Sequence, residues 1–294
     1  MTTYVFQGFE NLAKQYGVEQ AKAGFVLENY TSHAIVEIVE ENDLVDVVDL
    51  VHGGHTSIMM TAEIQERRKK DFNAARDAGV DVSSVKWYSG QEMQTAFGTN
   101  YPGFTFDAYN IWPLKFATQL FKIASQRLTA SSGSLSLHTN TPVIDVRPLD
   151  SDGWDVVTPR GSTACRYVLH TTNAYAGHLL PSMRGPAGIV PTRGQIIAVK
   201  SKNTGKSSWT NGDGEYWFPR TGPDTENPLV ILGGGRSHGG DSDIVDDSVS
   251  NPQVSKSLRD FLPNVFGAER REPEMEWVCA RSIWEALVYS TLFL

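Results

Sequence analysis

The spacing between apolar residues changes near residue 131, and this change limits the folds open to the chain. Up to that point apolar residues recur mostly every three or four positions, a period that predicts amphipathic helices. Beyond it they form short runs separated by Pro and Gly, which predicts strands. The order helix, hairpin, helix, meander and sheet predicts a mixed α/β or α+β fold with interleaved domains.

Particular residues place the ends of these elements. Helices are expected over 9–39, with a break at Gly17, over 62–78, ending at Gly79, and over 112–130, where Pro113 occupies the first turn. A hairpin is expected over 44–60, around a Gly-Gly turn, and a loop over 200–214. Strands are expected at 135–137, 143–146, 154–157, 166–170, 189–199, 216–218 and 229–232.

Composition excludes several classes of protein. The net charge of −8 and the lack of a basic stripe beyond 67–70, which fits a solvated helix face, predict no nucleic-acid partner. Two distant cysteines give neither a disulfide framework nor a CxxC spacing, so we expect a reducing, cytoplasmic location. No apolar run approaches the roughly 20 residues of a membrane span. His52 and His55 flank a Gly-Gly turn without a third ligand, so we predict no metal site.

Two segments could hold a nucleotide-like cofactor. An apolar strand over 166–170 leads into Thr171, Thr172 and Asn173, where small side chains would let a ligand approach the backbone. A strand with an ordinary Thr/Asn helix cap explains this segment equally well. The strand 229–232 runs into Gly233-Gly234-Gly235, which could lie close to a flat ligand or could form a plain glycine turn.

The aromatic segment 216–220 is a candidate substrate-binding strand. Its period of two predicts Tyr216 and Phe218 on one face and Trp217 on the other. One face could line an apolar pocket with Arg220 at its mouth, ready to bind a carboxylate. The alternative is a half-buried strand with a surface arginine.

Several segments share their order and spacing with one known family. They are Gly17–Ala21, Trp112-Pro113-Leu114, Thr141-Pro142-Val143, Gly153-Trp154, Gly161, Thr172–Tyr175, Pro191–Val199, Tyr216–Arg220 and Gly233–Arg236. Over roughly residues 5–277 the chain resembles the FAD-dependent oxidoreductases of the D-amino-acid oxidase and sarcosine oxidase superfamily, particularly γ-glutamylputrescine-oxidase-like members. The resemblance implies FAD as cofactor, a small amine or amino acid as substrate, and oxidation of its CH–NH bond to an imine with formation of hydrogen peroxide.

The resemblance also implies roles for single residues. Val143 and Ile144 would lie by the FAD adenine, and Thr171, Thr172 and Asn173 by the diphosphate. On the substrate side, the residues implied are Tyr216, Phe218, Arg220, Gly234 and Arg236.

The sequence departs from the family pattern at both ends. We find no GxGxxG segment before the first helix, and the resemblance is expected to stop at Trp277. We therefore expect a fragment truncated at both ends, colourless and inactive on its own. The alternative is a non-catalytic remnant or a module that binds a small molecule or a partner.

The expected domains are an incomplete FAD-binding domain interleaved with an antiparallel-sheet substrate domain. The FAD-binding part would comprise 1–42 and 112–184, the substrate part 43–111 and 185–277, and a divergent tail 278–294.

Overall fold

The computed structural model describes residues 2–185, 188–201, 205–212, 214–221, 227–235, 244, 246–267 and 269–283. The helices are α1 Phe9–Tyr16, α2 Val18–Glu41, α3 Ala62–Asp77, α4 Gly90–Phe97, α5 Pro113–Ala130, α6 Ala176–Leu179 and α7 Pro252–Phe266, with single 3-10 turns at Asn173–Tyr175 and Pro181–Met183. The strands are β1 His55–Ile58, β2 Lys86–Tyr88, β3 Gly103–Phe106, β4 Asp145–Pro148, β5 Trp154–Thr158, β6 Gly161–Cys165, β7 Val190–Lys200, β8 Ser208–Thr210, β9 Tyr216–Pro219, β10 Leu229–Gly234 and β11 Met275–Ile283.

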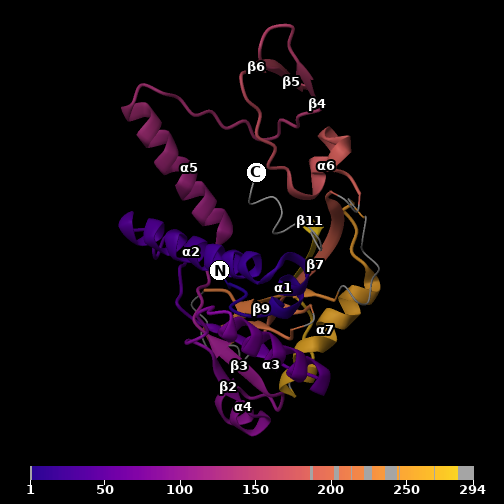
Figure 1. Cartoon of the computed structure of the whole chain (residues 1–294). Helices are drawn as coiled ribbons and strands as arrows, with labels where there is room; N and C mark the ends of the chain where they lie inside the picture. The colour runs from indigo at the N-terminus through magenta and orange to yellow at the C-terminus, as the bar shows by residue number, and fades with distance from the viewer. Residues whose placement is uncertain are drawn as a thin grey trace.

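These strands form two sheets. An eight-stranded sheet has the order β11-β7-β10-β9-β8-β1-β3-β2, and a three-stranded sheet has the order β4-β5-β6. All pairs in the large sheet are antiparallel except β1 with β8, which is parallel. Figure 1 shows α5 and the three-stranded sheet at the end of the molecule away from α4. This mixed architecture confirms the predicted fold class.

One face of the large sheet packs against α7. Trp209 of β8 and Trp217 of β9 stack at 5.5 Å between ring centroids, and Phe261 of α7 meets Trp217 edge to face at 5.3 Å. Both indoles are almost fully buried. Burial of a large apolar side chain contributes about 1.5–3 kcal/mol to folding, so this aromatic layer stabilises the packing of the sheet on α7. The opposite face of the sheet is left for other residues.

A second core joins the N-terminal segment to α3 and β3. The rings of Phe6 and Phe104 lie 5.0 Å apart, and Phe9 meets Phe25 of α2 at 5.6 Å. The buried carboxylate of Asp71 accepts hydrogen bonds from the backbone N–H groups of Gly8 (2.9 Å) and Glu10 (3.2 Å). It therefore caps the start of α1 from another helix, a contact that sequence spacing does not reveal.

Local signals place most helix ends correctly. Gly17 separates α1 from α2 with φ of 90°, and Gly79 follows α3 with φ of 78°, in the left-handed region. Pro113 opens α5 as predicted, but no side chain of α5 is buried, so its apolar residues form no packed face within the described part of the chain.

Three predicted strands are wrong. Residues 44–49 form turns, and Val51 makes only a single bridge to Asn110, so β1 pairs with β3 and β8 instead of closing a local hairpin. Residues 135–137 have no regular structure. The third strand of the meander is β6, which begins at Gly161 directly after the turn at residues 159–160, and residues 166–170 belong to neither sheet. Leu169 is 87% exposed because, in the described chain, no neighbouring strand lies beside it.

Candidate functional site

Two adjoining hollows lie beside the face of the large sheet opposite α7. The larger, which we call the β8–β9 cavity, has a volume of about 580 Å³, and the smaller, the Arg220 pocket, about 240 Å³. They share the wall residues Asn110, Ile111, Pro113 and Phe218. The larger volume is in the range of roughly 300–1,000 Å³ that is typical of sites for small organic molecules, and the smaller one lies just below it.

The alternation of β9 directs side chains into these hollows. Tyr216 and Phe218 line the β8–β9 cavity; Trp217 also borders it, but its indole stacks against Phe261 on the α7 side. Tyr216 pairs with Gly233 of β10, and a Cβ at Gly233 would lie 2.4 Å from the Tyr216 hydroxyl oxygen. Because Gly233 has no side chain, the tyrosine side chain can cross β10 at this position.

Arg220 lines the smaller pocket directly after β9. Its guanidinium carbon lies 3.7 Å from the centroid of the Trp112 ring, a stacked cation–π contact. Lys115 also approaches this ring, at 4.6 Å, but its ammonium is paired with Asp49 at 2.9 Å. No carboxylate pairs with the Arg220 guanidinium among the described residues, so its N–H groups can donate hydrogen bonds to the carboxylate of a ligand.

His55 lies in the wall of the β8–β9 cavity and is only 2% exposed. Its Nδ1 lies 2.8 Å from Ser208 Oγ and its Nε2 lies 3.1 Å from Thr210 Oγ1. Burial lowers the pKa of His55 to about 3, because the charged imidazolium would lose its hydration there. The ring is therefore neutral at physiological pH.

The two histidines of the Gly-Gly turn do not meet. His52 stacks on Tyr109 at 4.5 Å, with its side chain 56% exposed, whereas His55 points into the sheet. No cluster of three or more metal-binding side chains occurs in the residues that the structure describes. Sequence reasoning considered His55 only as a metal ligand and did not place it in a cavity, because its partners come from β8, about 150 residues away.

The other two predicted substrate-side residues are Gly234 and Arg236. Gly234 has φ of 133°, and a Cβ there would lie 2.6 Å from Glu215 Cα, so this glycine allows β10 and β9 to approach closely. It lines neither hollow. Arg236 lies outside the described residues.

The residues predicted to bind the cofactor do not line the hollows that contain the predicted substrate-binding residues. Val143 and Ile144 precede β4, and Ile144 is 54% exposed. Thr171, Thr172 and Asn173 are exposed, and none of the five lines either hollow. The roles assigned to these five residues therefore stay predictions.

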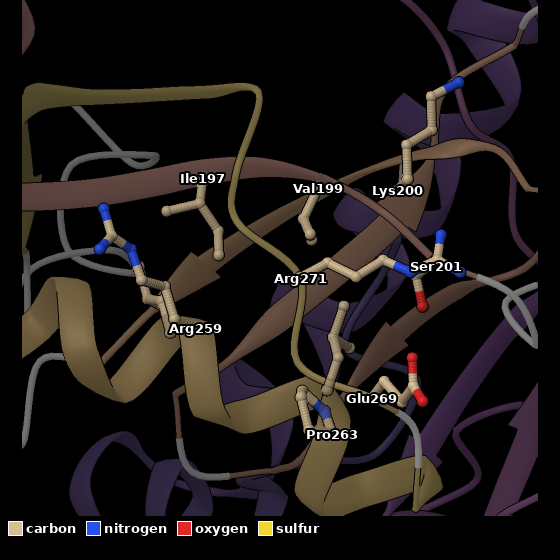
Figure 2. A pocket seen from close by; sticks show the side chains of 10 residues that line it. Ile197, Val199, Lys200, Ser201, Arg259, Pro263, Glu269 and Arg271 are labelled. Carbon is tan, nitrogen blue, oxygen red and sulfur yellow. The ribbon is translucent and has the colours of Figure 1, made fainter.

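Figure 2 shows a third hollow, between β7 and α7, with Lys200, Arg259, Arg271 and Glu269 around it. Its volume is about 20 Å³, which is room for about one water molecule. This hollow is too small for an amine substrate.

The model of the DAO family, described as FAD dependent oxidoreductase, matches residues 11–289. The chain therefore belongs to this family of FAD-dependent oxidoreductases. The match continues past Trp277, which corrects the expected end of the resemblance, and β11 also continues through Ile283. The narrower resemblance to γ-glutamylputrescine oxidases stays a prediction, as does the five-part domain division.

Solved structures agree on the fold. Glycine oxidase from Geobacillus kaustophilus is 18% identical with a TM-score of 0.63, covering 91% of this chain and 67% of that one. Glycine oxidase from Bacillus cereus is 17% identical with a TM-score of 0.64, covering 90% and 68%. Iminodiacetate oxidase from a Chelativorans species is 15% identical with a TM-score of 0.64, covering 89% and 69%.

No curated protein matches the chain by sequence. Within the described residues, no helix combines the length and apolar character needed to cross a membrane.

Proposed function

We propose that the chain contributes the substrate-binding side of an oxidoreductase that uses FAD to oxidise the CH–NH bond of an amine or amino acid to an imine, with formation of hydrogen peroxide. Membership of the FAD-dependent family supports the redox class. The names of similar structures, glycine oxidase and iminodiacetate oxidase, support a small amine that carries a carboxylate.

The observation that carries this proposal is the position of Arg220. Its guanidinium lies over the Trp112 ring in the smaller of the two adjoining hollows, and aromatic side chains of β9 form the wall beside it. An arginine that lies over an aromatic ring and has no carboxylate partner among the described residues is well suited to a ligand carboxylate, because its planar donors match the two oxygens. Tyr216 and Phe218 would then contact the body of the substrate.

Calorimetric titration of the full chain with hexanoate tests the carboxylate site. We expect Arg220→Gln to weaken hexanoate binding at least about tenfold, since it removes a charge-assisted pair. A matched control, Arg147→Gln, changes an exposed arginine on β4 whose partner is Asp145 and should leave the affinity unchanged. Equal hexanoate affinity in the wild type and Arg220→Gln would refute the assignment.

A second function, non-catalytic binding of a small molecule, is favoured by one observation. Four of the five residues predicted to contact FAD are exposed, Val143 is half-buried, and none of the five lines either hollow. The two functions are separated by adding FAD and an amine carboxylate to the purified chain and measuring peroxide. Peroxide production supports the oxidase, and carboxylate binding without peroxide supports the binding module.

A further inference from the structure

Four hydroxyl groups and one imidazole form a connected cluster in the wall of the β8–β9 cavity. His55 joins Ser208 and Thr210, as described above. Ser208 Oγ also lies 3.1 Å from Thr2 Oγ1 and 3.4 Å from the carbonyl oxygen of Gly54. Thr210 Oγ1 lies 3.3 Å from Ser57 Oγ. Ser208, Thr210 and His55 all line the cavity.

The protons of this cluster can be counted, because a neutral imidazole has one donor nitrogen and one acceptor nitrogen. If Nδ1 carries the proton, it donates to Ser208, and Thr210 donates to Nε2. If Nε2 carries the proton, it donates to Thr210, and Ser208 donates to Nδ1. Thr210 then donates to Ser57.

In both tautomers the hydroxyl proton of Thr210 is held by another protein group. In the first tautomer Ser208 donates to Gly54 or Thr2, and in the second to His55, so its proton is held as well. Thr210 therefore has only oxygen lone pairs left for a ligand, whichever nitrogen of His55 is protonated.

The charged side chains beside the cavity do not compete for these acceptors. Arg68 donates to Asp71 at 3.4 Å and to the carbonyl of Gly212 at 2.7 Å. The carboxylate of Glu215 accepts from the side-chain amide of Asn211. A ligand in the cavity thus meets an acceptor at Thr210 that is suited to an N–H group.

Thr210 and Arg220 are far apart along the same face of the sheet. Thr210 pairs with Tyr216, and Arg220 follows Tyr216 by four residues, which corresponds to about 13 Å along an extended strand. An α-amino acid carries both polar groups on one carbon, which is much shorter than this backbone separation. A ligand that meets both has its N–H group and its carboxylate several bonds apart.

We infer that Thr210, oriented by His55, accepts a hydrogen bond from the amino group of an elongated amino carboxylate whose other end binds Arg220. This inference rests on the proposed function for the carboxylate end. Binding of the amino group at Thr210 is independent of carboxylate binding at Arg220, so either can be refuted without the other.

Calorimetric titration of the full chain with four probes tests the inference: 6-aminohexanoate, hexanoate, hexylamine and glycine. We expect 6-aminohexanoate to bind more tightly than hexanoate or glycine. Thr210→Val keeps the side-chain shape and removes the acceptor, so it should weaken 6-aminohexanoate about tenfold and leave hexanoate unchanged. Arg220→Gln should weaken both.

The control variant is Thr192→Val on β7. The hydroxyl of Thr192 is buried, has no hydrogen-bond partner in the described chain and lines neither hollow. This variant should bind all four probes like the wild type. Equal midpoints of thermal unfolding for Thr210→Val and Thr192→Val would show that the loss of affinity does not come from a loss of folded structure.

Two results would overturn the inference. One is unchanged 6-aminohexanoate affinity in Thr210→Val, and the other is glycine binding as tightly as 6-aminohexanoate in the wild type. If hexanoate does not bind at all, the carboxylate site of the proposed function fails, and hexylamine becomes the test of Thr210. Weaker hexylamine binding in Thr210→Val would then support the acceptor site, and equal binding would contradict it.

Discussion

His55 links the stability of the fold to pH. The folded protein keeps this imidazole neutral, with a pKa of about 3, whereas in the unfolded chain it titrates near its usual value of 6.5. Below pH 6.5 the unfolded state therefore binds a proton that the folded state does not bind. Stability rises with pH wherever the unfolded state binds more protons, so the contribution of His55 is complete above pH 6.5 and is lost as pH falls toward 3.

The size of this effect follows from the difference between the two pKa values. Each pH unit in this window changes the free energy of unfolding by about 1.4 kcal/mol. Two units below 6.5, at about pH 4.5, His55 should have reduced the stability by about 2.7 kcal/mol. This is a large fraction of the free energy of unfolding of a typical domain, which is roughly 5–15 kcal/mol.

Urea unfolding of the wild type and of His55→Gln at pH 7.0, 5.5 and 4.5 measures the effect. Comparison with the variant is needed because carboxylates also titrate at the lower end of this range. We expect the difference in stability between the two proteins to change by about 2–3 kcal/mol across the series, in favour of the variant at low pH. His52→Gln, which changes the exposed histidine of the same turn, should follow the wild type. Parallel pH profiles for the wild type and His55→Gln would refute the reasoning.

Two further substitutions test contacts that position the site. Asp71→Asn weakens the cap of α1 and removes the buried charge that pairs with Arg68, so urea unfolding should show a loss of about 3 kcal/mol. The exposed control Glu66→Gln should leave the midpoint unchanged, and similar midpoints for both variants would contradict the assignment. Gly233→Ala forces a Cβ against Tyr216 and should lower the free energy of unfolding in urea by about 1–3 kcal/mol. Most of that loss should vanish in a Tyr216→Ala background. An equal loss in both backgrounds would mean that the clash is not with Tyr216.

Local signals in the sequence predict the parts of the fold that local chemistry decides. Gly17 and Pro113 fix helix ends because their backbone preferences need no distant partner. The alternation of β9 likewise separates Tyr216 and Phe218 from Trp217, since period two is a property of any strand.

Features that depend on distant partners escape sequence reasoning. Residues 166–170 have the composition of a strand, but β6 closes the meander and no described strand lies beside them. Thr210 falls in a segment that its Gly, Ser and Lys content predicts to be a loop, yet pairing with β1 and Tyr216 makes it part of a strand. The acceptor cluster depends on that pairing and on the burial of His55, which no local pattern shows.

The central claim is that the β8–β9 cavity and the Arg220 pocket form the substrate side of an oxidoreductase that uses FAD. The most direct test is peroxide production by the purified chain incubated with excess FAD and an amine that carries a carboxylate, measured beside hexanoate binding and the visible flavin spectrum on the same preparation. We predict hexanoate binding, and peroxide production by chain that retains flavin. Failure to bind hexanoate, or retained flavin without peroxide, would contradict the account.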